Sequence, residues 1–181
     1  MTLTTTLFRG VVLLLAALTL GACSGWDPGS DEEHRVRVAQ TLERFKAQDP
    51  GIQRFFDNAH GYAIFPTVGK GAIGVGGAYG QGEVYQGGRA IGSTELIQLT
   101  IGFQWGGQAY SEIIFFKDAN ALDRFKSGKL KFSAQASAVA VTAGASATAD
   151  YENGVAVFTL ARGGLMYEAS IGGQSFSFEA Y

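Results

Sequence analysis

Cysteine and histidine are scarce in this chain of 181 residues, which has one cysteine, Cys23, and two histidines, His34 and His60. A single cysteine excludes an intrachain disulfide and any metal site built from several cysteines. Neither histidine has a partner at metal-ligand spacing, so we expect structural roles for both and no metal site. No hydrolase nucleophile elbow, phosphate-binding loop or zinc signature is present. The sequence therefore predicts a protein that is not an enzyme and carries no cofactor.

Long apolar runs are also missing, because the longest is the ten-residue stretch 11–20. A transmembrane helix needs about 20 such residues, whereas an export signal needs only about ten, after a positive start and before small residues. The sequence Leu20-Gly21-Ala22-Cys23 resembles the lipobox of bacterial lipoproteins, which implies cleavage before Cys23 and acylation of that cysteine. We expect a lipoprotein signal peptide at 1–22, an acylated cysteine and short tether at 23–30, and one domain at 31–181.

Acylation predicts a protein that is anchored to a membrane, since two acyl chains already give stable attachment. Ser24 follows the cysteine, where lipoproteins retained in the inner membrane often carry Asp. This resemblance favours the periplasmic face of the outer membrane.

Neither sign of charge is in large excess. Loss of residues 1–22 removes one arginine, which leaves 13 Lys and Arg against 16 Asp and Glu and a net charge of −3. This balance gives no reason to expect nucleic acid as a partner.

Helical periodicity is confined to the start of the predicted domain and one later segment. Val38, Leu42 and Phe45 form an apolar stripe behind a capping box that starts at Ser30, which predicts a helix over 31–48. Its polar face mixes both signs of charge, so we expect it to pack on the rest of the domain and not to lie in a bilayer.

Two shorter helices are predicted from their caps. Asp49-Pro50 starts one that ends at Gly61, and its buried face consists of Ile52, Phe55, Phe56 and Ala59. Asp118 starts the other, which continues through Leu122 and Phe125 and ends at Gly128.

Strand-like patterns dominate after Gly61. The expected strands are 62–65 (ended by Pro66), 71–79, 83–86, 94–104, 109–116, 155–160, 165–169 and 175–178, with turns at Gly87-Gly88 and Asn153-Gly154. Glycine supplies 26 residues, about twice the usual share, and lies among Val, Ile, Phe and Tyr, where it marks bends in a curved sheet. The predicted fold is mainly β: a small β-barrel of short, mostly antiparallel strands with about three helices on its surface.

Residues 132–149 are a long run of Ala, Ser, Val, Thr and Gly with almost no bulky side chain. Such a run suits either a strand in a tight barrel interior or a flexible loop. The residues alone leave these two interpretations open.

The segment from Gly69 to Gly74 matches G-x-G-x-x-G. A dinucleotide site requires a helix to begin there, with its N-terminus facing the pyrophosphate. Three glycines in the residues that follow make a poor helix, so we expect kinks in a strand.

The basic residues concentrate in one place. Arg124, Lys126, Lys129 and Lys131 fall within eight residues, interleaved with apolar side chains, and Lys70 is a fifth candidate. Basic residues beside apolar ones suit an anionic lipid surface. The alternative is a solvated helix end, where the helix dipole favours lysine.

Three stretches of the chain resemble the SYLF domain, which is known from eukaryotic lipid-binding proteins and bacterial lipoproteins. They are Asn58–Tyr85, Gly102–Gly128 and Ala147–Gly173, and the most distinctive piece is an A-x-F-P turn followed by K-G-x-x-x-G-x-x-x-G. The resemblance implies a β-barrel core with helices on its surface, binding to phosphoinositides and other anionic phospholipids, and no catalysis. In yeast relatives it also implies binding of actin filaments.

These observations predict a membrane-anchored, non-enzymatic module that binds anionic phospholipid or phosphoinositide headgroups weakly. The alternative is a structural or assembly lipoprotein of the cell envelope that docks a protein partner. The basic residues favour the first hypothesis, and the balanced charge of the mature chain favours the second.

Overall fold

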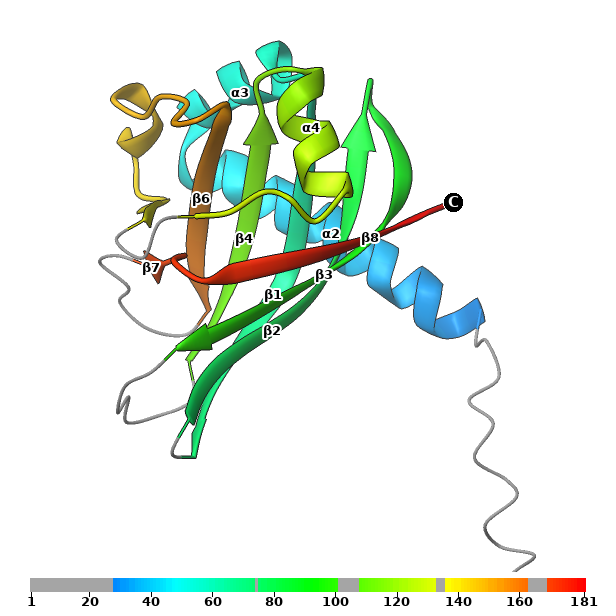
Figure 1. Ribbon diagram of the computed structural model, residues 1–181. Helices are drawn as coiled ribbons and strands as arrows, with labels where there is room; N and C mark the ends of the chain where they lie inside the picture. Colours follow the sequence, from blue (N-terminus) through cyan, green and yellow to red (C-terminus); the bar gives the residue numbers. More distant parts are fainter. Residues whose placement is uncertain (1–27, 74, 101–107, 133–135, 163–168) are drawn as a thin grey trace, which may run out of the picture. The chain divides into compact units, whose positions relative to one another are not determined.

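The computed structural model describes residues 28–73, 75–100, 108–132, 136–162 and 169–181 (Figure 1). The chain divides into two compact units, Met1–His34 and Arg35–Tyr181. The second unit carries the sheet and all the contacts discussed below.

One sheet of eight strands forms the framework. Its strands are β1 (Gly61–Ile73), β2 (Val75–Gln86), β3 (Arg89–Thr100), β4 (Gln108–Phe116), β5 (Ser137–Ala140), β6 (Val155–Arg162), β7 (Ala169–Ser170) and β8 (Gln174–Ala180). The strand order is β7-β5-β6-β4-β1-β2-β3-β8. Every pair is antiparallel except β5 with β6, which confirms the mainly β, mostly antiparallel prediction.

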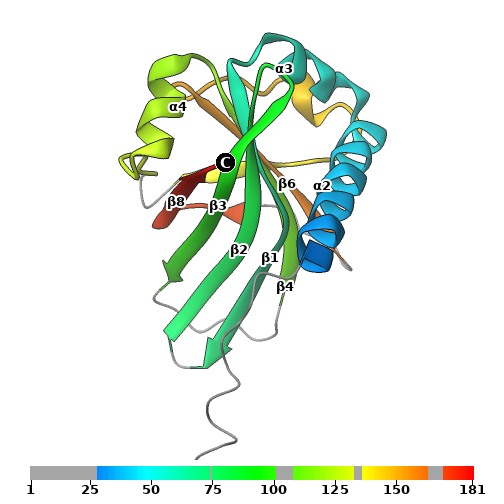
Figure 2. The same ribbon diagram turned by 90° about the vertical axis from the view of Figure 1, so that its right-hand side faces the viewer.

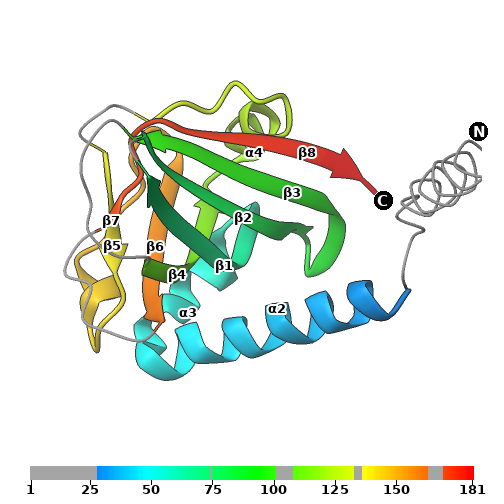
Figure 3. The ribbon, with the colours of Figure 1, turned by 90° about the horizontal axis from the view of Figure 1, so that it is seen from below.

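Three α-helices accompany the sheet in the described part of the chain, as predicted. They are α2 (Pro28–Gln48), α3 (Gln53–Asn58) and α4 (Ala119–Lys126), with short 3-10 helices η1 (Pro50–Ile52) and η2 (Ala145–Ala147). The Arg35–Gln48 part of α2 and helix α3 lie below the sheet in Figure 3, and α4 lies on its other side.

The sheet is strongly curled but open. Its edge strands β7 and β8 are connected by only three residues, 171–173, so the Cα atoms of Ser170 and Gln174 lie at most about 14 Å apart. In addition, the ring of Phe65 on β1 lies 6.0 Å from that of Phe176 on β8, although β2 and β3 separate these strands in the sheet. No pairing joins β7 to β8 among the described residues, so the predicted closure into a barrel is not confirmed.

Each face of the central strands β1 and β4 has its own core. The concave face gathers Ala63, Phe65, Ile114 and Phe116 with residues of α4 and β8. The convex face gathers Ile64, Ile113, Phe115 and Phe158 with Val38 and Phe45 of α2 and with Ile52 and Phe55. Figure 2 shows α4 and α2 on opposite sides of the sheet. The predicted stripe of α2 therefore packs on the sheet, as expected.

Several local predictions are confirmed at the residues that carry them. Helix α2 ends at Gln48, and Asp49 caps η1 with Pro50 at its first position. Gly87 and Gly88 have φ of +57° and +77°, and Asn153 and Gly154 have φ of +51° and +84°. These left-handed conformations are those of the tight hairpin turns predicted from the sequence.

Other boundaries were wrong. Helix α2 begins at Pro28 and not after a cap at Ser30, and α3 ends at Asn58, so Gly61 opens β1 instead of ending a helix. The predicted strand 71–79 is divided between β1 and β2, whose connection at Gly74 lies outside the described residues. The predicted residues 101–104 and 165–168 also lie outside them.

Pro66 does not end a strand, because β1 passes through it. The register of β1 shifts between Ile64 and Thr67 against β2, and between Phe65 and Val68 against β4. Proline has no N–H to donate, and a bulge removes the need for one. The Pro66 carbonyl accepts a hydrogen bond from the Ser111 hydroxyl (2.7 Å).

The described part of the small-residue segment 132–149 is neither a long strand nor a free loop. It forms the four-residue strand β5 and then η2, which the Asp49 carboxylate holds against η1. Asp49 is 2 % exposed and accepts hydrogen bonds from the backbone N–H of Gly51 (3.1 Å) and of Ser146 (2.6 Å). Burial alone raises the pKa of this carboxyl, but the N–H donors of Ser146 and Gly51 outweigh it and lower the pKa below 3.8.

We expect Asp49→Asn to lower the free energy of unfolding of the 24–181 fragment at pH 7 by about 1–2 kcal/mol, since hydrogen bonds to a charged acceptor are replaced by weaker ones. The lowered pKa in the folded state means that the charge stabilises the fold above the unfolded pKa. This contribution is lost as the pH falls through the folded pKa.

Urea unfolding of both proteins at pH 7 and pH 3 measures this difference. The difference in the free energy of unfolding between wild type and variant should be smaller at pH 3 than at pH 7. An equal gap at both pH values would show that the carboxylate charge contributes nothing to this junction.

Candidate functional site

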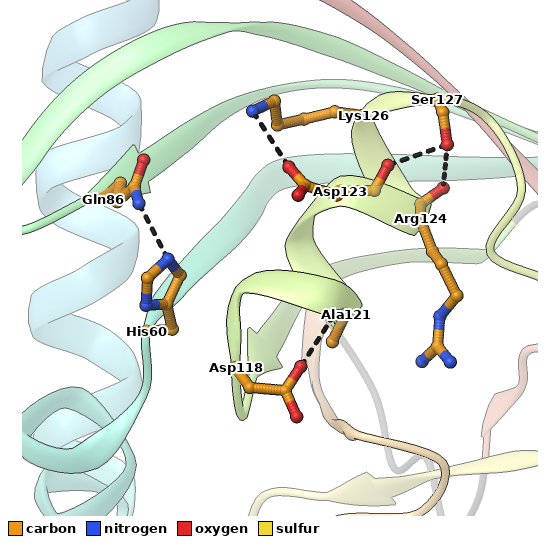
Figure 4. A network of polar contacts seen from close by, with 8 residues as sticks. All are labelled: His60, Gln86, Asp118, Ala121, Asp123, Arg124, Lys126 and Ser127. Carbon is orange, nitrogen blue, oxygen red and sulfur yellow. Dashed lines mark hydrogen bonds and ion pairs between the residues drawn. The ribbon is translucent and has the colours of Figure 1, made fainter.

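The basic segment is built on α4 and the four residues after it. The Asp118 carboxylate accepts a hydrogen bond from the N–H of Ala121 (2.9 Å) and caps the helix, as predicted (Figure 4). Phe125 is fully buried, with its ring 4.9 Å from those of Phe116 and Phe176. Helix α4 is thus fixed to the concave core by its apolar face.

Gly128 ends the helix in a left-handed conformation, with φ of +66°. The Arg124 carbonyl then accepts hydrogen bonds from the N–H groups of Lys129 (2.8 Å) and Leu130 (3.0 Å). This arrangement is typical of glycine-terminated helices.

Residues 129–132 alternate between solvent and core. Leu130 is 4 % exposed and belongs to the concave core, and the Phe132 ring packs edge-on at 6.0 Å from Phe176. Lys129 and Lys131 are exposed. Two apolar anchors therefore hold a short segment whose two lysines face solvent.

The other two cations of the cluster are already engaged. The Arg124 guanidinium donates to the carbonyl of Asn153. The Lys126 ammonium lies 3.3 Å from a carboxylate oxygen of Asp123 and 5.9 Å from the centre of the Phe178 ring. Among the described residues, we find no ion pair with Lys129 or Lys131.

Lys70 is not brought to this cluster. Its backbone pairs with Ala78 and Gln108, nine residues along β1 from Gly61. A Cβ on Gly61 would lie 3.5 Å from Leu122 of α4, so Gly61 marks the end of β1 beside the helix. Nine strand residues span roughly 30 Å. The Lys70 side chain and the whole of Cys23 lie outside what the structure describes.

The sequence did not predict a cluster of polar side chains on the concave side of the sheet. Gln174 of β8 donates through Nε2 to the Glu112 carboxylate of β4 (3.0 Å), with the Tyr110 hydroxyl at 3.5 Å. Gln98 donates to the carbonyl of Gly172 (2.9 Å). Burial, with the charge of Glu112, raises the pKa of Tyr110. These contacts link β8 to β4 across the concave side. In the sequence, the only signal for them is that Thr94 and Gln98 lie two positions on either side of the apolar Leu96, which places polar and apolar side chains on the same face of the strand.

A third buried carboxylate, Glu83, lies on the convex side. It is 2 % exposed and accepts hydrogen bonds from the hydroxyls of Tyr85 (2.6 Å) and Tyr181 (3.4 Å). The Tyr62 ring stacks on that of Tyr85 at 4.9 Å, and burial, with the charge of Glu83, raises the pKa of Tyr62 to about 12. This cluster joins strand β2 to the end of β8 by polar contacts.

No metal centre emerges from the described residues, which contain no group of three or more His, Cys, Asp or Glu side chains able to hold an ion. His60 is exposed and lies 2.8 Å from the amide nitrogen of Gln86 (Figure 4). The described part of the segment 69–74 is strand and not the helix that a dinucleotide site requires. Within the described ranges, no helix has both the length and the apolar character needed to cross a bilayer.

The fold and the basic segment define a mainly β domain with a solvent-facing lysine pair, and comparison with known proteins shows what part of the chain is similar to. Residues 97–180 match the Ysc84 family, described as Las17-binding protein actin regulator. This match confirms the SYLF resemblance for the part of the chain from β3 to β8. It includes two of the three resembling stretches, 102–128 and 147–173, whereas 58–85 lies before it.

A curated relative extends the similarity towards the N-terminus. Beta cell expansion factor A of Aeromonas veronii is 26% identical over 157 residues, which are 83% of this chain and 59% of the relative. The chain therefore spans less than two thirds of the length of that relative.

We expect Gly128→Ala to lower the free energy of unfolding of the 24–181 fragment by about 1 kcal/mol, because only glycine adopts the left-handed conformation without cost. A Cβ at this position meets the Phe176 carbonyl oxygen at 3.5 Å, an ordinary contact, so the backbone supplies the strain.

Urea unfolding tests this expectation, with Gly69→Ala as the matched control. Gly69 lies in β1 with nothing within 4 Å of an added Cβ, so its variant should change stability by less than about 0.5 kcal/mol. Equal stability of the two variants would mean that the turn after α4 does not require glycine.

Proposed function

We propose that this protein is a non-enzymatic module that binds anionic phospholipid or phosphoinositide surfaces weakly through Lys129 and Lys131. The observation that carries the proposal is the alternation of residues 129–132, in which Leu130 is buried and both lysines are exposed. A flexible loop would have to be ordered on binding, whereas this segment is already held by its anchors.

The electrostatic gain expected from such a contact is modest. A basic residue close to an anionic bilayer contributes about 1 kcal/mol, so the two lysines contribute about 2 kcal/mol. Arg124 and Lys126 add to the local potential but are tied to Asn153 and Asp123. The contact is therefore suited to a protein that is already held near a membrane.

We propose further that acylated Cys23 supplies this attachment at the periplasmic face of the outer membrane. The lipobox-like sequence before Cys23 supports this part of the proposal. Helix α2 begins at Pro28, so the tether after Cys23 consists of the four residues 24–27 and reaches at most about 14 Å. A short tether confines a domain at an effective concentration up to the millimolar range, at which weak binding suffices.

The lysine pair is tested with vesicles of phosphatidylcholine and phosphatidylglycerol and with the 24–181 fragment, which contains the compact unit Arg35–Tyr181. We expect Lys129→Gln with Lys131→Gln to weaken binding about 30-fold, which corresponds to the loss of about 2 kcal/mol. Wild-type binding should also fade between about 0.05 and 0.5 M salt, because the charges become screened.

The matched control is Arg35→Gln with Arg44→Gln, which removes two exposed charges of α2, on the opposite side of the sheet from α4 (Figure 2). It should leave vesicle binding within about threefold of wild type. Equal loss in both double variants would assign the contact to net charge or to α2, and a folded wild-type fragment that binds no anionic vesicle would refute the proposed function.

For the anchor, we expect Cys23→Ser in the full chain to abolish lipidation and to release the protein from the washed membrane fraction. The measurement is cell fractionation at high salt together with the mass of the purified protein. A variant that remains with the membranes after the high-salt wash would show that the anchor lies elsewhere.

One observation favours the alternative, a lipoprotein that docks an envelope protein. Tyr79 and Ile97 are direct cross-strand neighbours on β2 and β3, and they are 49 % and 50 % exposed. The Tyr79 hydroxyl donates to the Glu95 carboxylate (2.9 Å), which orients the ring. Pairs of exposed apolar side chains are typical of protein contacts, but this pair is small.

A further inference from the structure

We infer that the lysine pair recognises the charge density of an anionic lipid surface and not the stereochemistry of a particular headgroup. This inference rests on the proposed function and specifies its ligand class. It rests on the type of hydrogen-bond donor that residues 124–132 can offer to a lipid headgroup.

Selective binding of a phosphorylated headgroup needs donors with fixed directions. Proteins supply them as arginine forks, as N–H groups at helix N-termini, or as turns that point several N–H groups at one anion. Each of these holds a phosphate in one orientation and so distinguishes one headgroup from another.

At this site several of those donors already have partners within the protein. The Arg124 guanidinium donates to the Asn153 carbonyl, and the N–H groups of Lys129 and Leu130 both donate to the Arg124 carbonyl. The Lys126 ammonium faces Asp123. The adjacent helix end is the C-terminus of α4, which carries partial negative charge and disfavours a phosphate.

Of the four cations in residues 124–132, Lys129 and Lys131 are the two whose side chains have no hydrogen bond or ion pair with another described residue. Lysine is a point charge on a flexible stem and imposes little direction on its ligand. Both lysines are exposed and Leu130 between them is buried, so the two side chains leave the segment on its solvent side. Two such charges respond to the surface potential of any anionic bilayer.

The test compares phosphatidylcholine vesicles that contain phosphatidylglycerol, phosphatidylserine or phosphatidylinositol 4-phosphate, adjusted to the same measured zeta potential. We expect the 24–181 fragment to bind all three with affinities within about threefold. The Lys129→Gln and Lys131→Gln double variant should lose about 30-fold on each vesicle. The matched charge-preserving variant, Lys129→Arg with Lys131→Arg, should bind like wild type.

Soluble phosphates separate a lipid surface from a free phosphate as the source of the charge. Glycerol 3-phosphate and inositol phosphate, added at constant ionic strength, should not displace the fragment from the vesicles. Displacement by either compound, or a tenfold preference for the phosphoinositide vesicle at equal zeta potential, would overturn the inference and leave the proposed function standing. Absence of binding to every anionic vesicle would refute the proposed function itself.

Discussion

The structure depends on two central strands, β1 and β4, that are apolar on both faces. Ile64 and Ile113 are buried on the convex side, while their neighbours Phe65 and Ile114 are buried on the concave side. Such strands must be covered twice. The convex face is covered by the Arg35–Gln48 part of α2 and by α3, and the concave face by the curl of the sheet and by α4. The position of α4, and with it that of residues 129–132, follows from this requirement.

The segment after β5 shows how a part of the chain without bulky side chains is held in place. Residues 141–149 have little apolar surface to bury, so polar contacts fix them. Besides the Asp49 contacts, the Arg54 guanidinium donates to the carbonyls of Ser146 (2.7 Å) and Ala149. It also lies over the Phe55 ring, 4.5 Å from its centre, so charge-assisted hydrogen bonds are combined with a cation–π contact.

What could be predicted from the sequence was local. The caps at Asp49 and Asp118 and the turn at Asn153-Gly154 depend on neighbours within a few residues, and all three are found. The continuation of β1 through Pro66 depends instead on the register with β2 and β4, which no local pattern encodes. The same limit applies to the candidate site, because four of its cations are close in sequence whereas the place of Lys70 depends on strand pairing.

The polar contacts inside the curl were missed for a related reason. Gln174 and Glu112 are 62 positions apart, and their meeting requires the whole strand order from β4 to β8. A buried carboxylate is costly unless it accepts hydrogen bonds, so this contact disfavours any arrangement in which β8 lies elsewhere. The link also fixes Phe176, two residues further along β8, on which Phe125 and Phe132 pack. The lysine segment is thus oriented by a polar contact on the concave side as well as by its own apolar anchors, and this explains how a short sequence at the end of a two-turn helix keeps a defined direction.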